Sequence, residues 1–506
     1  MTRTVGVQEN TQFLIHLPRP LGLCWLGLLP PKRSFKLGFV LSVLYIVTTY
    51  LTPETLFGPL AAYRVELILA SLIVLVSMHF VIRSFILKTP QSLALIGLSL
   101  AVFLSVLIGQ RWFGGGVQAF LAFIPNAFAY FLVCLHCNSK TKLQVLVLMF
   151  LFVCLFVVVR GVPDLYREVH ESAQRAPGQT EAQENIDVGQ WNTEHPYVLE
   201  MENDAGEKFY RLRGLGVIND PNDFAQLTVC VIPLMFIFWR AKKVLQNIVF
   251  VILPVCILLG AVFLTHSRGA LIALMAIAIV AARRRFGTAP ALVMAGALFA
   301  AAMALQFTGG RGISAGAGED RTALWSEGLE AFKGNPLFGI GIGGLSDYTD
   351  EHLTAHNSVI VCAAELGLFG LYFWSIFLFS TVRDALVIAS PVKVSEGRPL
   401  ELEEVPFPQP ATKIELIDKA EINRLGRLMV LSLTGFLAAG MFLSRAFVAT
   451  LFLLGGMTEV IFEKARERGM VASRLTLVRV LRNAGVLTVT LLVMMYCIIR
   501  ILNLMR

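Results

Sequence analysis

Long apolar runs, separated by short polar connections, fill most of this 506-residue chain. Each run approaches the length at which an α-helix crosses a hydrocarbon core of about 30 Å. The strands of a membrane β-barrel would instead alternate polar and apolar residues over about ten positions. The pattern therefore predicts an all-α polytopic membrane protein with about 12–13 transmembrane helices. The runs fall at 37–51, 61–82, 91–109, 116–136, 143–160, 216–239, 244–264, 268–282, 288–306, 357–382, 426–444, 446–462 and 483–502.

The composition agrees with this prediction. Hydrophobic residues make up 56% of the chain and charged residues 15%, whereas soluble domains are under half apolar and about a quarter charged. These values exclude an ordinary soluble enzyme, and the 36 Phe in long apolar runs exclude a disordered chain. The 8 Cys are too few and too scattered for a disulfide scaffold.

The net charge of +8 is mostly a topological signal. Lys and Arg cluster after the second, fourth, sixth and eighth runs, which all lie on one side if each run crosses once. The positive-inside bias predicts that this side is the cytoplasm. The external side then holds two long loops, 161–215 and 307–356, and the first of these is acidic. Loops of this length are usually functional or disordered.

These assignments divide the chain into parts. Residues 1–36 are broken by prolines and end in a basic cluster, which predicts an interfacial segment rather than a signal peptide. Runs 426–444 and 446–462 are short enough to form a re-entrant hairpin instead of two spans. The parts are N-terminal membrane helices at 1–160, an external loop at 161–215, central membrane helices at 216–306, an external loop at 307–356, and C-terminal membrane helices at 357–506 with a cytoplasmic loop at 383–425.

Two arginines precede the sixth run. Arg211 and Arg213 are followed by Pro221, which suits the first turn of a helix that Asn219 or Asp220 would cap. A helix N-terminus attracts anions, so the arginines and the helix together favour an anion site at the external face. The alternative is a charged helix flank with an ordinary cap.

Another arginine, Arg268, stands between two apolar runs with scarcely any loop, in the stretch Thr265-His-Ser-Arg-Gly. At the external edge this charge opposes the positive-inside bias. A buried arginine needs an anionic partner, and phosphate matches its planar fork. The alternative is that Arg268 reaches out to the lipid headgroups. His266 is better read as a turn residue than as a catalyst.

The second external loop contains a helical pattern. Trp325 follows Arg321 by one turn, and the apolar spacing predicts an amphipathic helix at the external interface. Glycines at 339, 341, 343 and 344 superficially resemble a dinucleotide-binding loop, but no strand precedes them, so we discount that match.

A histidine follows this loop directly. His356 begins the stretch His-Asn-Ser at the start of the tenth run, where a histidine can act as a general base near neutral pH. On this evidence alone, His356 and Asn357 more often just cap the helix. Glu365 within the apolar run needs a partner, which the sequence does not identify.

In this order, the segments resemble the O-antigen ligase and Wzy-type polysaccharide polymerase superfamily. No single motif is specific, whereas the ordered set is, and it covers roughly residues 210–375; the acidic loop 161–209 has no counterpart. The matching stretches are Arg213-x-x-Gly216 with Pro221-Asn222, Ser267-Arg268-Gly269-Ala270, Arg321-x-x-x-Trp325, Pro336-Leu-Phe-Gly-Ile-Gly, and His356-Asn-Ser with Glu365-Leu-Gly-x-x-Gly370.

The resemblance implies a GT-C-like membrane glycosyltransferase with its active site at the periplasmic face of the bacterial inner membrane. It would move a glycan from an undecaprenyl-diphosphate-linked donor to a glycan or lipid A-core acceptor, by metal-independent inverting transfer without a cofactor. Arg213 and Arg268, helped by Arg321 and Arg211, would bind the diphosphate, and His356 would be the catalytic base. The supporting residues would be Trp325, Asn222, Asn357 and Glu365.

Several functions remain open at this point. A polymerase and a ligase for O-antigen or exopolysaccharide share these motifs, and two elaborated external loops slightly favour the polymerase. A transporter or flippase of lipid-linked saccharides would place its ionisable groups at mid-membrane, and a structural scaffold would need no particular polar side chain. We expect membrane lipids around the spans and no nucleic-acid partner.

Overall fold

Every predicted span coincides with a helix in the computed structural model, which describes residues 37–53, 65–83, 89–174, 195–202, 208–305, 307, 316–390, 413–471 and 474–504. Among these residues, seven helical segments are long and apolar enough to cross a membrane, and three shorter apolar helices accompany them. The prediction of an all-α polytopic membrane protein is confirmed. The predicted interfacial segment 1–36 lies outside the described residues.

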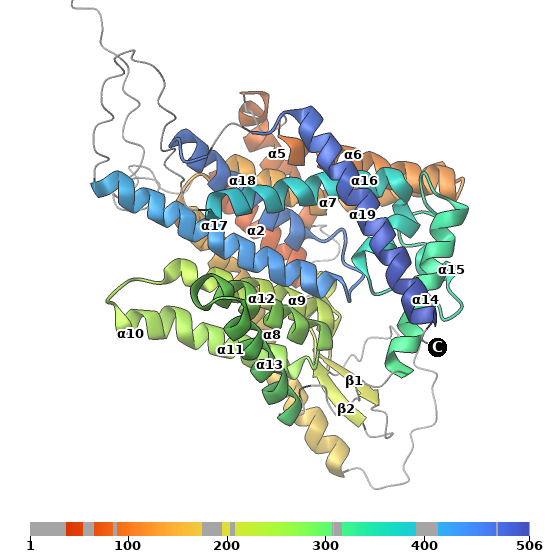
Figure 1. Ribbon diagram of the computed structural model, residues 1–506, viewed down its shortest axis with the longest axis horizontal. Helices are drawn as coiled ribbons and strands as arrows, with labels where there is room; N and C mark the ends of the chain where they lie inside the picture. The colour runs from red at the N-terminus through yellow and green to blue at the C-terminus, as the bar shows by residue number, and fades with distance from the viewer. Residues whose placement is uncertain are drawn as a thin grey trace, which may run out of the picture.

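The elements follow one another along the chain as shown in Figure 1. They are α2 Leu37–Leu51, α5 Val65–Arg83, α6 Pro90–Leu104, the π-helix η2 Ser105–Gly109, α7 Phe113–His136, α8 Lys140–Gln174, β1 Val198–Glu202, β2 Lys208–Leu212, the 3-10 helix η3 Gly216–Ile218, α9 Pro221–Met235, the 3-10 helix η4 Phe236–Phe238, α10 Val244–Asn247, the π-helix η5 Ile248–Ile252, α11 Leu253–Leu264, α12 Arg268–Phe286, α13 Thr288–Ala304, α14 Gly316–Gly334, α15 Leu345–Tyr348, α16 Ser358–Ala389, α17 Lys413–Gly440, α18 Ala449–Glu467 and α19 Leu477–Leu504.

Helix α16 is the central element of the bundle. It packs against α6, α17, α18, α19 and α14, while α17 also packs against α9 and α12. The rings of Tyr130, Phe377 and Phe452 meet edge to face between α7, α16 and α18, and all three are fully buried. Aromatic pairs of this geometry stabilise beyond the area that they bury, so this contact fixes the three helices against one another.

A break in α16 receives the glycine-rich segment. Gly367 has φ +65°, a backbone conformation that glycine adopts without strain and other residues rarely adopt. A Cβ at this position would lie 2.5 Å from the carbonyl carbon of Leu337. The segment runs beside this break, with Leu368 N donating to Pro336 O at 2.8 Å and Gly341 N to Glu365 O at 3.0 Å. Among the glycines at 339–344, Gly339 serves close packing against α16, because a Cβ there would lie 2.3 Å from the carbonyl of Glu365.

The predicted loop 161–215 contains regular structure near both of its ends. Helix α8 continues past the predicted end of its span at 160 to Gln174, with Pro163 inside it, so the first part of the predicted loop 161–215 is helical. The last part of that loop is an antiparallel hairpin, in which Val198 pairs with Leu212. The hairpin packs on α8 where Gly161 leaves room for Leu212, since a Cβ at Gly161 would lie 2.4 Å from that side chain.

Residues 426–462 fall in two helices, and neither is among the seven described helices that are long and apolar enough to cross a membrane, so the choice between two spans and a re-entrant hairpin stays a prediction. Helix α17 has 28 residues and α18 has 19, and the connection 441–448 separates them.

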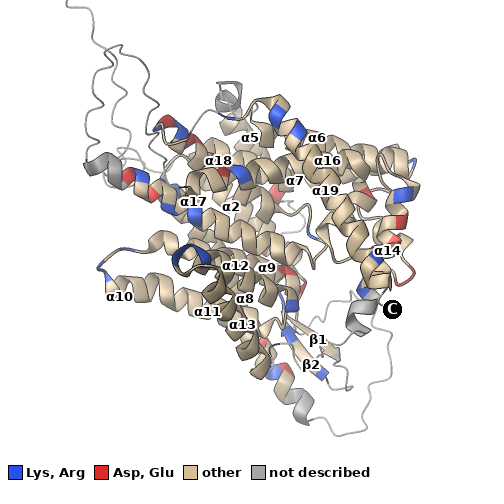
Figure 2. Cartoon of the chain, viewed as in Figure 1, with Lys and Arg blue, Asp and Glu red and all other residues tan. Residues whose placement is uncertain are grey.

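We call the side of the bundle that bears β1–β2 the hairpin side. Helices α9, α12 and α16 begin on this side, and α17 ends there. Lys and Arg gather at the other ends of α12 and α17 and around the start of α10 (Figure 2).

Candidate active site

Segments far apart in the sequence bring positive charges together on the hairpin side. Arg211 comes from β2, Arg268 from the first turn of α12, and Arg321 from α14. Burial lowers the pKa of Arg211 to about 10, Asp220 opposes this shift, and the positive charges of Arg268 and Arg321 add to it. Burial and the charge of Arg268 likewise lower the pKa of Arg321. The three guanidinium groups therefore lie within electrostatic reach of one another.

Arg211 is the most deeply buried of these arginines, with 3% of its surface exposed. Its Nε donates to the Thr265 carbonyl at 2.8 Å, and Nη2 donates to Asn222 Oδ1 at 2.8 Å. Nη1 faces Met201 Sδ at 3.3 Å. Because these bonds join the hairpin to the turn before α12 and to the start of α9, Arg211 holds the other site segments in register.

The start of α9 supplies a carboxylate. Asp220 is the N-cap, accepting from Asn222 N at 2.7 Å, and Pro221 occupies the first turn, so the predicted helix start is confirmed and Asp220 is the capping residue. Arg213 Nε donates to the Pro196 carbonyl at 3.0 Å. Burial lowers the pKa of Arg213, and the negative charge of Asp220 opposes this.

Arg268 begins α12 directly after its cap. Ser267 Oγ accepts from Ala270 N at 3.4 Å, which places Arg268 at the first helical position. His266 has φ +49° in the preceding turn, and its Nδ1 lies 2.9 Å from the Phe307 carbonyl. His266 is thus a turn residue.

His356 lies in a strained loop immediately before α16. Its φ is +46°, a conformation that costs a side-chain-bearing residue about 1–3 kcal/mol. Trp325 Nε1 donates to the Ala355 carbonyl at 2.7 Å, and His356 N donates to Ser444 Oγ at 3.0 Å. Ser444 Oγ in turn donates to Thr354 Oγ1 at 2.7 Å. The surrounding segments therefore hold this backbone in place.

The capping role belongs to Asn357 alone. Its Oδ1 accepts from Val359 N at 2.9 Å and Ile360 N at 3.2 Å, and its Nδ2 donates to Met441 O at 3.2 Å. Capping therefore does not account for His356. Burial lowers the pKa of His356, and the charge of Arg321 lowers it further against the opposing charge of Asp220. The imidazole is thus neutral near pH 7 and able to accept a proton.

Helix α14 carries Arg321 to this place. Leu324 and Ala331 are buried on its inner face, and a Cβ at Gly328 would lie 2.5 Å from Ile360 of α16. The helix packs against α16 and α19, so the predicted amphipathic helix forms. Its close contact with α16 places Arg321 within electrostatic range of His356.

Glu365 lies apart from the arginines. It stands nine residues beyond His356 on α16, which at about 1.5 Å per residue is more than two helical turns. Its buried carboxylate accepts hydrogen bonds from the backbone of Gly343 and Leu345. The partner that the sequence did not identify is therefore a pair of backbone N–H groups, and Glu365 fixes the glycine-rich segment.

The sequence analysis missed Arg445. This residue lies in the connection 441–448 and forms an ion pair with the buried Asp223 through both Nε and Nη2. Burial lowers the pKa of Arg445, and the charge of Asp220 opposes this, as it does for Arg213. An arginine between two apolar runs is the signal that identified Arg268, and it would have identified Arg445 as well.

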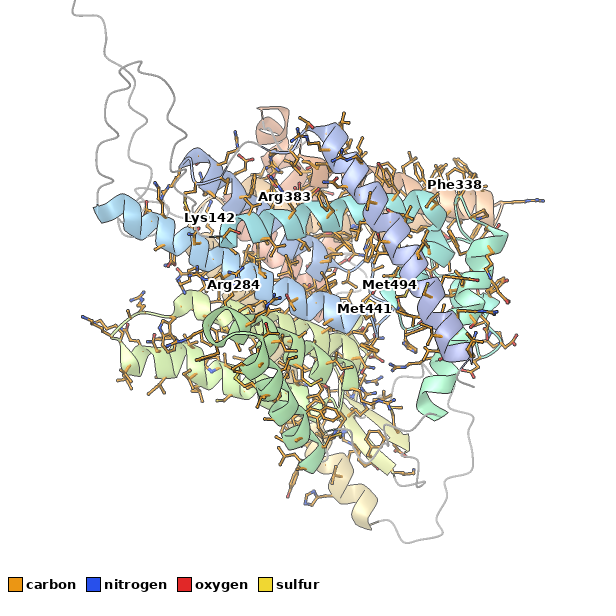
Figure 3. All side chains as sticks on the ribbon, viewed as in Figure 1. Lys142, Arg284, Phe338, Arg383, Met441 and Met494 are labelled. Carbon is orange, nitrogen blue, oxygen red and sulfur yellow. The ribbon has the colours of Figure 1, made fainter. Side chains whose placement is uncertain are left out.

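An apolar groove begins beside the His356 loop. Its volume is about 700 Å³, and it lies between α16, α17 and α19. Ser358 and Met441 line one end, and Arg383 lines it near the far end of α16 (Figure 3). The walls between them are apolar and include Trp374, Leu378, Leu437 and Leu491.

Comparison with known families gives one match. Residues 253–375 match the family described as O-antigen ligase. The matched segment runs from α11 into α16 and contains Arg268, Arg321 and His356. No curated protein sequence matches the chain. The resemblance based on the ordered motifs is thereby confirmed.

Proposed function

We propose that this chain, an O-antigen ligase-type membrane protein by its residues 253–375, transfers a glycan from an undecaprenyl-diphosphate-linked donor to an acceptor sugar. The observation that carries the proposal is the convergence of the buried Arg211 and the half-buried Arg268 and Arg321, with Arg321 beside His356. Arg211, Arg268 and Arg321 interact electrostatically with one another, and the charge of Arg321 acts on His356. Buried positive charge is costly unless an anion compensates it, and a diphosphate is the anion that arginine binds best.

In the proposed reaction the arginines stabilise the leaving group. Arg213, Arg268 and Arg321, braced by Arg211, would bind the diphosphate of the donor. The bond between the anomeric carbon and the diphosphate oxygen breaks, and its electron pair stays on that oxygen as the lipid diphosphate leaves. Fixed cationic donors in a buried site stabilise such developing charge without reorganisation, so the transfer needs no metal ion.

His356 would activate the acceptor. Its neutral imidazole takes the proton of the acceptor hydroxyl as the hydroxyl oxygen bonds to the anomeric carbon, and later releases that proton to water. Attack from the face opposite to the leaving diphosphate inverts the configuration of that carbon. Trp325, Asn222 and Asn357 would support the reaction by holding the His356 loop and Arg211.

The apolar groove suits the lipid part of the donor. It starts at Ser358, two residues after His356, and extends along α16 between membrane helices. A polyprenyl chain in this groove would place its diphosphate at the hairpin side, beside the arginines. The positive-inside bias assigns the hairpin side to the periplasmic face of the bacterial inner membrane.

The alternative is a transporter or flippase of lipid-linked saccharides. Transporters bind their substrates near mid-membrane, within broken helices. Arg268 and His356 instead lie where α12 and α16 begin, which favours an enzyme. The choice between a polymerase and a ligase rests on the sequence argument alone, which slightly favours a polymerase.

Surface polysaccharide in a deletion strain tests the proposal. His356→Ala and Arg268→Ala should each abolish glycan transfer while the protein still inserts into the membrane. Arg285→Ala, an exposed arginine on the opposite side of the bundle, is the matched control and should restore transfer. Normal polysaccharide from either stably inserted site variant would refute the proposal.

The deletion strain also separates the two enzymes. Single repeats on the acceptor without long chains would identify a polymerase. Full-length polymer accumulating on the lipid carrier would identify a ligase.

A further inference from the structure

A second cavity lies beside the site, against the Asp223–Arg445 ion pair. Its volume is about 210 Å³, and its walls come from four helices together with η3 and the connection 441–448. Tyr50 comes from α2, Asn126 from α7, Gln226 from α9, and Thr450 from α18. None of these four residues belongs to the motifs discussed above.

The lining includes several polar side chains although it lies among membrane helices. Gln226 and Asp223 are almost fully buried. Gln226 Nε2 donates to the Phe436 carbonyl at 3.1 Å, and the hydroxyls of Tyr50 and Thr450 lie 2.7 Å apart. Polar groups at such positions are costly and usually functional, so we ask which ligand they would recognise.

The chemistry of the lining fits a neutral molecule with many hydroxyl groups. The amides of Asn126 and Gln226 both donate and accept hydrogen bonds, as sugar hydroxyls do. Arg445 neutralises the carboxylate of Asp223, so the pair adds no net charge to the cavity. Phe447 contributes an aromatic side chain to the wall. A diphosphate would find one paired arginine here, whereas Arg211, Arg268 and Arg321 are grouped together.

The size and position of the cavity indicate which sugar of the acceptor it would hold. The cavity has a volume of about 210 Å³ and suits one sugar ring. The hydroxyl that attacks the anomeric carbon belongs to the sugar at the end of the acceptor, so the ring bound here would be the terminal one. Ser444 lines the cavity and also accepts the backbone N–H of His356, which brings a bound ring close to the base.

We propose that this cavity binds the terminal sugar of the acceptor, with Asn126, Gln226 and Asp223 recognising its hydroxyl groups. The inference rests on the proposed glycan transfer. The Asp223–Arg445 pair then separates two subsites, one for the donor diphosphate and one for the acceptor ring. Arg445 is a positioning residue, because it orients Asp223 toward the sugar.

Sugar binding tests the inference without the reaction. Full-length protein in nanodiscs would be mixed with a panel of free monosaccharides (hexoses, 6-deoxyhexoses and N-acetylhexosamines), and binding followed by saturation-transfer NMR. At least one sugar should bind to the wild type and equally to Arg268→Ala. Asn126→Leu, which preserves volume and removes both hydrogen-bonding groups, should weaken this binding about tenfold, the loss of one to two hydrogen bonds.

The matched control is Ser99→Ala, a buried polar residue of α6 that lines a separate apolar cavity and should not alter sugar binding. Thr450→Val, which is isosteric, should weaken binding in the same direction as Asn126→Leu. The inference is wrong if no sugar of the panel binds, or if Asn126→Leu binds as Ser99→Ala does.

The transfer assay then separates this inference from the proposed function. Asn126→Leu should raise the KM for the acceptor about tenfold and leave the KM for the donor unchanged. A rise in the donor KM alone would contradict the acceptor assignment. Full activity of either His356→Ala or Arg268→Ala would overturn the proposed function, whatever the sugar-binding result.

Discussion

Trp325→Phe tests how the fold holds the base in place. The substitution keeps an aromatic ring on α14 but removes the indole N–H that donates to Ala355 O at 2.7 Å. His356 follows Ala355 directly and has φ +46°, so the loop needs compensating contacts to keep this conformation. The other described contacts are the bonds that join His356 and Thr354 to Ser444.

The expected loss follows from these contacts. The strained backbone of His356 costs about 1–3 kcal/mol. Each of the three hydrogen bonds, from Trp325 to Ala355, from His356 to Ser444 and from Ser444 to Thr354, contributes about 0.5–1.5 kcal/mol net to the stability of the loop. Gains and cost are thus of similar size, and removing one bond populates loop conformations in which His356 is displaced. A loss of about 0.5–1.5 kcal/mol lowers kcat roughly 2- to 13-fold. The KM for the donor should not change, because the arginines keep their places.

The assay is glycan transfer by purified protein in proteoliposomes. Trp239→Phe is the matched control, since this tryptophan is 44% exposed and lies at the opposite end of α9 from Asp220. If Trp325→Phe is as active as this control, the bond to Ala355 does not hold the base. A loss of more than about a hundredfold would also contradict the reasoning, because a single neutral hydrogen bond cannot supply it.

Three further outcomes follow from the same structure. Arg321→Gln should raise the pKa of His356, because it removes a positive charge that lowers this pKa. The acid limb of the pH–rate profile, where the base becomes protonated, should then move to higher pH. An acid limb that stays in place would contradict the electrostatic interaction between Arg321 and His356. Arg268→Lys should keep the charge but lose the planar fork, so transfer should fall between wild type and Arg268→Ala in a kinetic comparison. Gly367→Ala should destabilise the protein by about 1–3 kcal/mol, because φ +65° with ψ −166° is a backbone conformation essentially confined to glycine, and the contact with Leu337 adds a further cost. A melting temperature equal to that of wild type would refute the account of the α16 break.

The apolar runs predicted the spans because burial in lipid requires continuous apolar residues. The same patterns also predicted local caps, since Pro221 and its preceding carboxylate specify a helix start by chain geometry alone. By contrast, the extension of α8 to Gln174 has no apolar run, so hydropathy ended that helix at 160. The β1–β2 strands are only five residues each, too short for a periodic signal.

The features of the site that the sequence did not predict depend on contacts between segments far apart in the chain. The partner of Glu365 is backbone from residues 343 and 345, and no side-chain pattern identifies a backbone donor. The pair Asp223–Arg445 joins residues 222 positions apart, a distance that only the packing of α9 against α17 specifies. Arg268 was accessible to the sequence because its position breaks a membrane rule by itself.

The most direct test of the central claim follows both products of the proposed reaction in one vessel. Proteoliposomes containing the full-length protein, an undecaprenyl-diphosphate-linked glycan and an acceptor would be assayed for new glycosidic bonds and for released undecaprenyl diphosphate. The account predicts one lipid diphosphate released for each bond formed by the wild type, and neither product from His356→Ala, although that variant still binds the donor. Movement of the intact donor across the bilayer without bond formation, or equal transfer by His356→Ala, would contradict it.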